Sequence, residues 1–173
     1  MNAKPHDNEK LSDLYLTDKQ ACYKLIIAQL KSLIENETYP ISNLANASAL
    51  LNLALPDINW VGFYLLKNEE LVLGPFQGKP ACIRIPVGKG VCGTAIAQGK
   101  SQLVPDVHSF PGHIACDSAS NSEIVIPIFA GNRIAGVLDI DSPVFDRFDR
   151  TDLEGLEEVA RILASGYNWD EII

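Results

Sequence analysis

The first third of the chain has apolar residues at helical spacing. They recur over residues 11–37, which predicts a helical region there. Thr17 and Asp18 could cap a second helical start inside it, because such side chains accept hydrogen bonds from the first free backbone N–H groups of a helix. Pro40 should end this region, and another helix is expected over residues 42–53.

The middle of the chain changes to patterns typical of β-strands, with β-branched and aromatic residues bounded by turn residues. Strands are predicted at 58–67, 71–76, 81–85, 103–104, 124–129 and 134–141. Turns at 67–70 and at Gly131-Asn132 join two hairpins. A glycine-rich turn begins at Val87 and leads into a short helix that ends near Gln98.

A last helical pattern covers residues 151–164. Asp149 or Thr151 is the expected N-cap, and Glu154 would complete a capping box with Thr151. Helices, then mostly hairpin-connected strands, then a helix predict an α+β domain with a central, mostly antiparallel sheet and helices on one face. The other face should form a loop-covered ligand pocket. The loop at 105–122 is long, and such loops are usually functional or disordered.

Side chains alternate between the two faces of a strand. In the first predicted strand, Val61, Phe63 and Leu65 share a face that suits a core beneath helices. Trp60 and Tyr64 share the other face, with a glycine between them. Buried Trp and Tyr usually need a hydrogen-bond partner. This second face therefore suits either a pocket wall or a half-exposed sheet surface.

Two carboxylates stand on one face of the last predicted strand. Asp139 and Asp141 lie two positions apart, roughly 7 Å at the usual rise of a strand, while Leu138 and Ile140 point to the other face. Aspartate is disfavoured within strands. Glu123 begins the neighbouring strand and could join them, and neighbouring carboxyls raise one another's pKa. One could then donate a proton near neutral pH; the alternative is a solvated sheet face.

The composition is that of a globular protein: 173 residues, 47% hydrophobic and 21% charged. Acidic residues number 22 and basic residues 14, a net charge of -8. The basic residues are scattered, which argues against nucleic-acid binding and against attachment to an anionic membrane surface. No secretory signal or membrane span is visible. We expect a cytoplasmic protein with a polar tail at 1–10 and a single domain at 11–173.

Four cysteines are present: Cys22, Cys82, Cys92 and Cys116. Their spacing is not that of a zinc site, so no metal and no cofactor are expected. Cytosolic disulfides are usually catalytic or redox-sensing, and buried inert thiols are the alternative. Cys92 lies where the glycine-rich turn opens a helix, a position that lowers a thiol pKa. The backbone N–H groups of that turn could also hold a carboxylate.

Six motifs occur in one order over most of the chain. They are Asn59-Trp60-Val61-Gly62-Phe63-Tyr64, Gly74-Pro75-Phe76-Gln77-Gly78, Ala81-Cys82, Gly88-Lys89-Gly90-Val91-Cys92-Gly93-Thr94-Ala95, His113-Ile114-Ala115-Cys116-Asp117 and Leu138-Asp139-Ile140-Asp141-Ser142. This pattern closely resembles the free methionine-R-sulfoxide reductases, which use a GAF-type domain. The three-cysteine pattern is specific, since most GAF domains are ligand-binding sensors without it. Cys22 is extra to the pattern.

The resemblance implies a cysteine relay. In this family a cysteine thiolate attacks the sulfur of free methionine sulfoxide, methionine leaves, and a sulfenic acid remains. A second cysteine condenses with it to a disulfide, which thioredoxin reduces. By position, Cys116 corresponds to the sulfenic-acid cysteine and Cys82 to its resolving partner. Cys92 corresponds to a third cysteine that can join the exchange, which conflicts with the helix-start argument; we follow the family pattern.

The resemblance also implies a substrate pocket. Trp60 would wall the S-methyl group, with Tyr64 packing or hydrogen-bonding nearby. Glu123, Asp139 and Asp141 would bind the sulfoxide and the polar end of the substrate. The expected partners are free methionine sulfoxide and thioredoxin. A non-catalytic GAF module that senses a small ligand or the redox state is the alternative, and a homodimer through the N-terminal helix is compatible with either.

Overall fold

The computed structural model describes residues 6–112, 118–165 and 169. The helices and strands follow one another in the order that the sequence predicts. In chain order they are α1 (His6–Thr17), α2 (Lys19–Ile34), α3 (Pro40–Ala54), β1 (Trp60–Lys67), β2 (Glu70–Gly78), β3 (Arg84–Pro86), α4 (Gly90–Gln98), β4 (Gln102–Val104), the 3-10 helix η1 (Val107–Ser109), β5 (Ser122–Ala130), β6 (Arg133–Ser142) and α5 (Arg150–Ala164).

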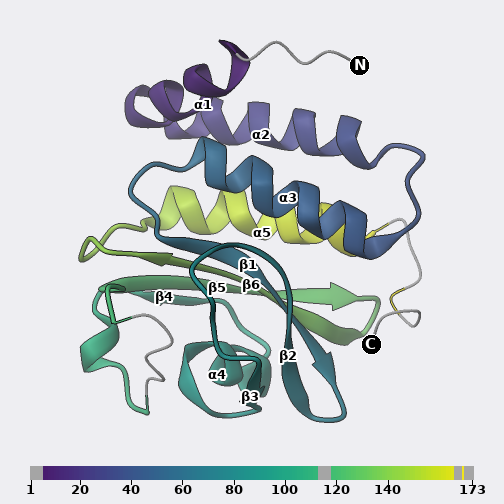
Figure 1. The fold of residues 1–173 in the computed structure, drawn as a ribbon, viewed down its shortest axis with the longest axis vertical. Coiled ribbons are helices and arrows are strands. Elements are labelled where there is room, and N and C mark those ends of the chain that lie inside the picture. Colours follow the sequence, from purple (N-terminus) through teal and green to yellow (C-terminus); the bar gives the residue numbers. More distant parts are fainter. Residues whose placement is uncertain (1–5, 113–117, 166–168, 170–173) are drawn as a thin grey trace.

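A six-stranded sheet with the strand order β3-β2-β1-β6-β5-β4 forms the centre of the molecule. All of its neighbouring pairs are antiparallel. Helices α1, α2, α3 and α5 lie on one side of the sheet, and α4 lies on the other (Figure 1). The predicted α+β architecture is confirmed. In the described part of the chain, no helix is long and apolar enough to cross a membrane.

The N-terminal helices differ from the prediction in where they begin. Helix α1 already includes residues 6–10, which we expected in the tail. Helix α2 starts at the predicted second cap, where the Asp18 side chain accepts a hydrogen bond from the Ala21 N–H at 2.9 Å. Pro40 begins α3 instead of preceding it. Proline suits this first position because the N–H group that it lacks would have no partner within the helix.

The third predicted strand, at 81–85, is shorter in the structure. Only Arg84–Pro86 is a strand paired with β2, and residues 79–83 belong to no helix or strand. In this segment the Cys82 carbonyl accepts a hydrogen bond from the hydroxyl of Tyr64, a residue of β1. The loop at 105–122 contains η1, and its residues 113–117 lie outside the described residues.

The sheet separates two hydrophobic cores. Val61, Phe63 and Leu65 join the larger core beneath the helices, as predicted. Trp60 and Tyr64 join the smaller core between the sheet and α4. Because a fully buried large apolar side chain stabilises a fold by about 1.5–3 kcal/mol, the helix-side core supplies most of the stability. The other side of the sheet is left for a site.

Helix α5 begins with a capping box that differs from the predicted one. Asp149 is the N-cap, one of the two expected candidates, and its side chain accepts hydrogen bonds from the Thr151 and Asp152 N–H groups. The reciprocal bond comes from Asp152, not Glu154. The partner moves because the third residue after the actual cap is Asp152.

The Asp152 carboxylate also joins three helices. It is fully buried and accepts hydrogen bonds from the hydroxyls of Tyr15 and Tyr23. Lys19 Nζ donates to it at 2.8 Å, and the Arg147 guanidinium lies 3.8 Å away. These contacts fasten α1 and α2 to the start of α5. They also satisfy a buried charge that would otherwise be costly.

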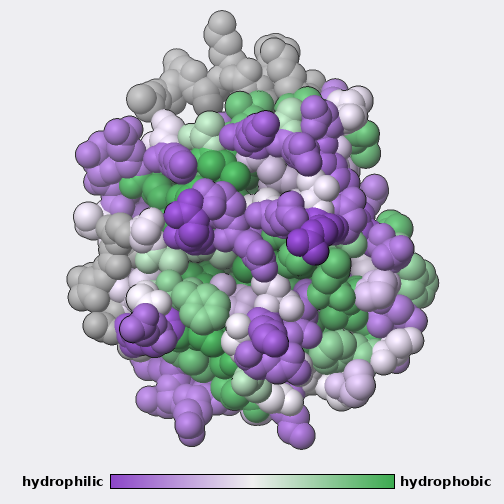
Figure 2. Space-filling view, turned by 180° about the vertical axis from the view of Figure 1, so that it is seen from behind, coloured by the Kyte–Doolittle hydropathy of each residue, from purple (hydrophilic) through white to green (hydrophobic). Residues whose placement is uncertain are grey.

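The surface of the molecule is mixed in character. Figure 2 shows hydrophilic side chains spread over the far side of the view in Figure 1, among separate hydrophobic areas. This face therefore has no single hydrophobic area that dominates the view.

We predict that Asp152→Ala lowers the free energy of unfolding by about 3 kcal/mol or more, because it strips a buried charge cluster of its carboxylate. Urea denaturation followed by circular dichroism measures this. Glu158→Ala is the control, since Glu158 pairs with Arg161 at the surface and such pairs contribute about 1 kcal/mol or less. If Asp152→Ala lowers the free energy of unfolding by less than about 1 kcal/mol, the value for a surface pair, the structural role of Asp152 is contradicted.

Candidate active site

The pairing of three strands brings the predicted site residues together. Trp60 of β1 lies opposite Asp141 of β6, and Asp141 lies opposite Glu123 of β5. Two residues along the same face, Gly62 lies opposite Asp139. Side chains alternate along each strand, so these residues share the face that points away from the helix layer. Glu123 and Asp139 are buried there, so this part of the sheet is not solvated.

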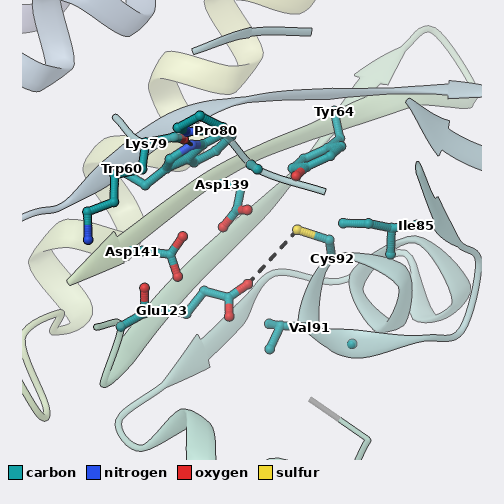
Figure 3. Close-up of a pocket in the computed structure, with 13 residues that line it drawn as sticks. Trp60, Tyr64, Lys79, Pro80, Ile85, Val91, Cys92, Glu123, Asp139 and Asp141 are labelled. Atoms are coloured by element: carbon teal, nitrogen blue, oxygen red, sulfur yellow. Dashed lines mark hydrogen bonds between the residues drawn. The ribbon is translucent and has the colours of Figure 1, made fainter. Parts of the chain in front are cut away.

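These residues line a pocket between the sheet and α4. In Figure 3 the three carboxylates and Cys92 converge on its centre, with Trp60 and Tyr64 on the opposite side. The start of α4 and the segment at 79–81 contribute further walls. The described lining residues are Trp60, Tyr64, Lys79, Pro80, Ala81, Ile85, Gly90, Val91, Cys92, Ser120, Glu123, Asp139 and Asp141.

The carboxyls of the pocket are arranged to hold protons. Glu123 and Asp139 are each 6% exposed. Burial, and then the charges of Asp139 and Asp141, raise the pKa of Glu123 well above its ordinary value. Burial likewise raises the pKa of Asp139 to about 6. This agrees with the expectation that one carboxyl of the cluster is protonated near neutral pH.

The same cluster has one unsatisfied acceptor. Asp139 Oδ1 is buried and has no hydrogen-bond partner among the described residues. A buried acceptor left unpaired costs about 1–3 kcal/mol, so this oxygen favours a proton or a donor group of a ligand. Cys92, Glu123 and Asp139 offer a sulfur and two oxygens within 4.8 Å of one another, a spacing that could also hold a divalent cation.

The aromatic wall is rigid. The Trp60 ring stacks with Tyr64, at a centroid distance of 5.8 Å, and with Phe76, at 5.3 Å. Its Nε1 donates a hydrogen bond to the Lys79 carbonyl at 3.1 Å. Gly62 leaves the space for this stack, because a Cβ there would lie 2.3 Å from the Phe76 Cβ. The Trp60 face is therefore a pocket wall, not a half-exposed surface.

Cys92 is not the low-pKa thiol that its place at a helix start predicts. It lies in the first turn of α4 but is only 3% exposed, and its thiol is 3.9 Å from Glu123 Oε1. Burial, followed by the charges of Asp139 and Glu123, raises the pKa of Cys92 well above its ordinary value. The nearby carboxyls and the loss of water outweigh the dipole of a short helix.

The other cysteines differ from Cys92 and from one another. Cys82 is half-buried beside the pocket-side core and is disulfide-bonded. Cys22 is a fully buried free thiol that donates to the Leu11 carbonyl at 3.2 Å, and burial raises its pKa to about 11. Cys22 therefore fits the alternative of a buried thiol that packs in the core. Cys116, the predicted nucleophile, lies outside the described residues.

A family model described as the GAF domain matches residues 47–166. The chain belongs to the GAF domain family. Free methionine-R-sulfoxide reductase of Escherichia coli (strain K12) is 56% identical over 142 residues, which are 82% of this chain and 86% of that protein. The resemblance seen in the motifs is confirmed.

Two solved structures of similar proteins carry substrate. The structure of fRMsr of Staphylococcus aureus in complex with substrate is 58% identical, with a TM-score of 0.79, and covers 82% of this GAF domain chain and 93% of that chain. The free methionine-R-sulfoxide reductase from Neisseria meningitidis in complex with its substrate is 50% identical, with a TM-score of 0.82 and coverages of 85% and 89%.

Some residues that line the pocket of this GAF domain, or support its wall, were missed in the sequence. Phe76 lies opposite Gly62, and strand alternation with the noted glycine gap could have identified it as the support of Trp60. Lys79 and Ser120 line the pocket from irregular segments. No periodic signal marks such segments, so only the tertiary structure could place these two residues.

We predict that Asp139→Asn flattens the pH dependence of stability. The folded-state pKa of Asp139 is raised, so its contribution to the free energy of unfolding is full below the ordinary carboxyl pKa and is lost as pH rises through about 6. The variant should be more stable than the wild type by about 1–3 kcal/mol above about pH 7. Urea titrations over a pH series measure this.

Asp106→Asn is the control. The Asp106 side chain is partly exposed, and the hydrogen bond that its carboxylate accepts from the Ser109 hydroxyl lowers its pKa. Its contribution therefore has the opposite sign and is lost as the pH falls. If the free energy of unfolding of Asp139→Asn depends on pH as steeply as that of the wild type, the pocket does not raise the pKa of Asp139.

Proposed function

We propose that this chain reduces free L-methionine (R)-S-oxide to L-methionine, using cysteine thiols that thioredoxin restores. The observation that carries the proposal is one pocket that combines proton-holding carboxyls with redox cysteines. Glu123 and Asp139 lie beside Cys92, and the adjoining segment bears the disulfide-bonded Cys82. The names of the similar proteins from Escherichia coli and Staphylococcus aureus support the same activity.

The pocket provides for both charged ends of a free amino acid. Asp141, the least buried of the three carboxyls, would pair with the substrate ammonium group. Lys79 is the one cationic side chain among the described lining residues. We propose that Lys79 and the N–H groups at the start of α4 attract the substrate carboxylate. A peptide bond would neutralise both ends, so peptide-bound methionine sulfoxide would be excluded.

The hydrophobic end of the substrate would face the aromatic wall. Trp60 offers an apolar surface for the S-methyl group, and its stacking with Tyr64 and Phe76 supports the ring. The opposite side of the pocket bears carboxyls, so only one epimer can present its methyl group to Trp60 and its oxygen to an acid. The names of the similar proteins from Escherichia coli and Neisseria meningitidis support the R epimer as the one selected.

Glu123 is the best candidate for the proton donor. Its pKa is raised by burial and by Asp139 and Asp141, so it holds a proton at a pH where an exposed glutamate would not. A sulfoxide oxygen leaves only after protonation, which makes such an acid useful. Asp139 shares the same buried site and could return a proton to Glu123 between turnovers.

The redox steps then follow cysteine chemistry. The Cys116 thiolate attacks the sulfoxide sulfur, the oxygen passes to the cysteine as a sulfenic acid, and methionine leaves. The Cys82 thiol condenses with this sulfenic acid, which forms a disulfide and releases water. A thioredoxin dithiol in the cytoplasm would reduce that disulfide by exchange. The raised pKa of Cys92 makes it a poor nucleophile, and we assign it a secondary role in disulfide exchange.

We predict that the protein, incubated with a thioredoxin system and racemic free methionine sulfoxide, consumes the R epimer and leaves the S epimer. Chiral separation of the remaining sulfoxide and quantification of methionine measure this. N-acetylated methionine sulfoxide amide, which lacks both charges, should not react. Absence of methionine would refute the proposal and favour a GAF sensor, and equal loss of both epimers would refute the epimer selection.

We predict that Cys116→Ser abolishes turnover even with dithiothreitol, because it removes the nucleophile. Cys82→Ser should retain methionine release in a single turnover but lose thioredoxin-driven cycling, since no intramolecular disulfide forms. Cys22→Ser is the matched control and should behave as the wild type, because Cys22 is buried on the helix side of the sheet. An active Cys116→Ser together with an inactive Cys92→Ser would show that Cys92, and not Cys116, is the nucleophile.

A further inference from the structure

The segment at 79–82 is held to the pocket by two side chains of one strand. Trp60 Nε1 donates to the Lys79 carbonyl at 3.1 Å, and the Tyr64 hydroxyl donates to the Cys82 carbonyl at 2.9 Å. Both donors belong to β1 and lie on the pocket face of the sheet. The segment therefore connects the wall of the substrate pocket directly to a redox cysteine.

The buried Tyr64 hydroxyl stays protonated and can donate a hydrogen bond. Its side chain is 1% exposed, and a buried phenol usually has a hydrogen-bond partner. Burial, and then the charge of Asp139, raise the pKa of Tyr64, so it keeps its proton. Although it lies near the carboxyl cluster, its hydroxyl bonds to the backbone of Cys82. We expected Tyr64 to contact substrate, and this bond gives it a second partner.

Regular structure does not hold Cys82 in place. Residues 79–83 belong to no helix or strand. Beyond Cys82, the next backbone anchor is the hydrogen bond from the Leu73 N–H to the Ile83 carbonyl at 2.9 Å. The Tyr64 bond lies between that anchor and the Trp60 bond to Lys79. It adds a side-chain hydrogen bond at the Cys82 carbonyl itself.

We propose that Tyr64 is a positioning residue for Cys82, whose carbonyl it holds so that the thiol meets the sulfenic acid of Cys116. The inference rests on the proposed function. In this step the two sulfurs bond, the S–O bond of the sulfenic acid breaks, and its hydroxyl leaves as water with the Cys82 thiol proton. Holding the thiol in place raises its effective concentration, which favours both the rate and the equilibrium of disulfide formation.

Tyr64→Phe tests the inference because it removes one oxygen and keeps the ring that stacks on Trp60. Reduced protein is mixed with one equivalent of methionine sulfoxide, and methionine release and disulfide formation are followed separately. A 1,3-dicarbonyl reagent traps the sulfenic acid. We expect disulfide formation to slow about fivefold relative to methionine release, the effect of losing one neutral hydrogen bond. Trapped sulfenic acid should rise accordingly.

Tyr23→Phe is the matched control. Tyr23 is also buried, and its hydroxyl donates to Asp152 at 2.9 Å on the helix side of the sheet. This variant loses the same kind of group, so its thermal midpoint should fall. Its ratio of disulfide formation to methionine release should match the wild type. A purely structural role of Tyr64 would make the two variants behave alike.

A redox titration with dithiothreitol needs no sulfoxide substrate. Tyr64→Phe should shift the equilibrium of the Cys82 disulfide about fivefold toward the dithiol, which is about 20 mV for a two-electron couple. Trp60→Phe, which removes the bond to Lys79, should shift it in the same direction by less. The cysteines are read out by alkylation and mass spectrometry.

Unchanged ratio and unchanged equilibrium in Tyr64→Phe would overturn the positioning role. If the wild type releases no methionine, the proposed function fails, and the redox titration alone decides whether Tyr64 controls Cys82. If Tyr64→Phe does not fold, Trp60→Phe decides, and an unchanged equilibrium in that variant overturns the inference.

Discussion

The register in which β6 pairs with β1 and β5 is the constraint on which the rest of the structure depends. It places Asp141 between Trp60 and Glu123, and Asp139 opposite Gly62. A slip of one residue would turn the β6 carboxyls toward the helix-side core and the apolar side chains of β6 toward the pocket. The apolar residues that alternate with the pocket residues oppose such a slip. Phe63 of β1 and Leu138 and Ile140 of β6 are fully buried in the helix-side core in this register.

The two faces of the sheet have opposite tasks. The helix side contains the larger core and the buried Asp152 cluster, where each charge has a partner. The pocket side contains carboxyls whose raised pKa reflects unfavourable burial of charge. Such a site lowers stability, and the helix side offsets this cost. Separating the faces allows a destabilising cluster to persist in a small domain.

The pocket and the cysteines are linked by an irregular segment. A regular strand at 79–83 would have satisfied its backbone groups through a neighbouring strand. Instead, the side chains of Trp60 and Tyr64 donate hydrogen bonds to this segment, so residues that line the pocket also hold the Cys82 carbonyl. Under the proposed function, binding and redox chemistry would share this support.

The sequence by itself determined the elements, the faces of β1 and β6, and the grouping of Asp139 with Asp141, because these depend on local periodicity. It also predicted the second helical start at Asp18. Only the tertiary structure decided the environment of Cys92 and the bond from Tyr64 to Cys82. Burial and long-range pairing set these features, and they depend on the strand order and on irregular segments that no local pattern encodes.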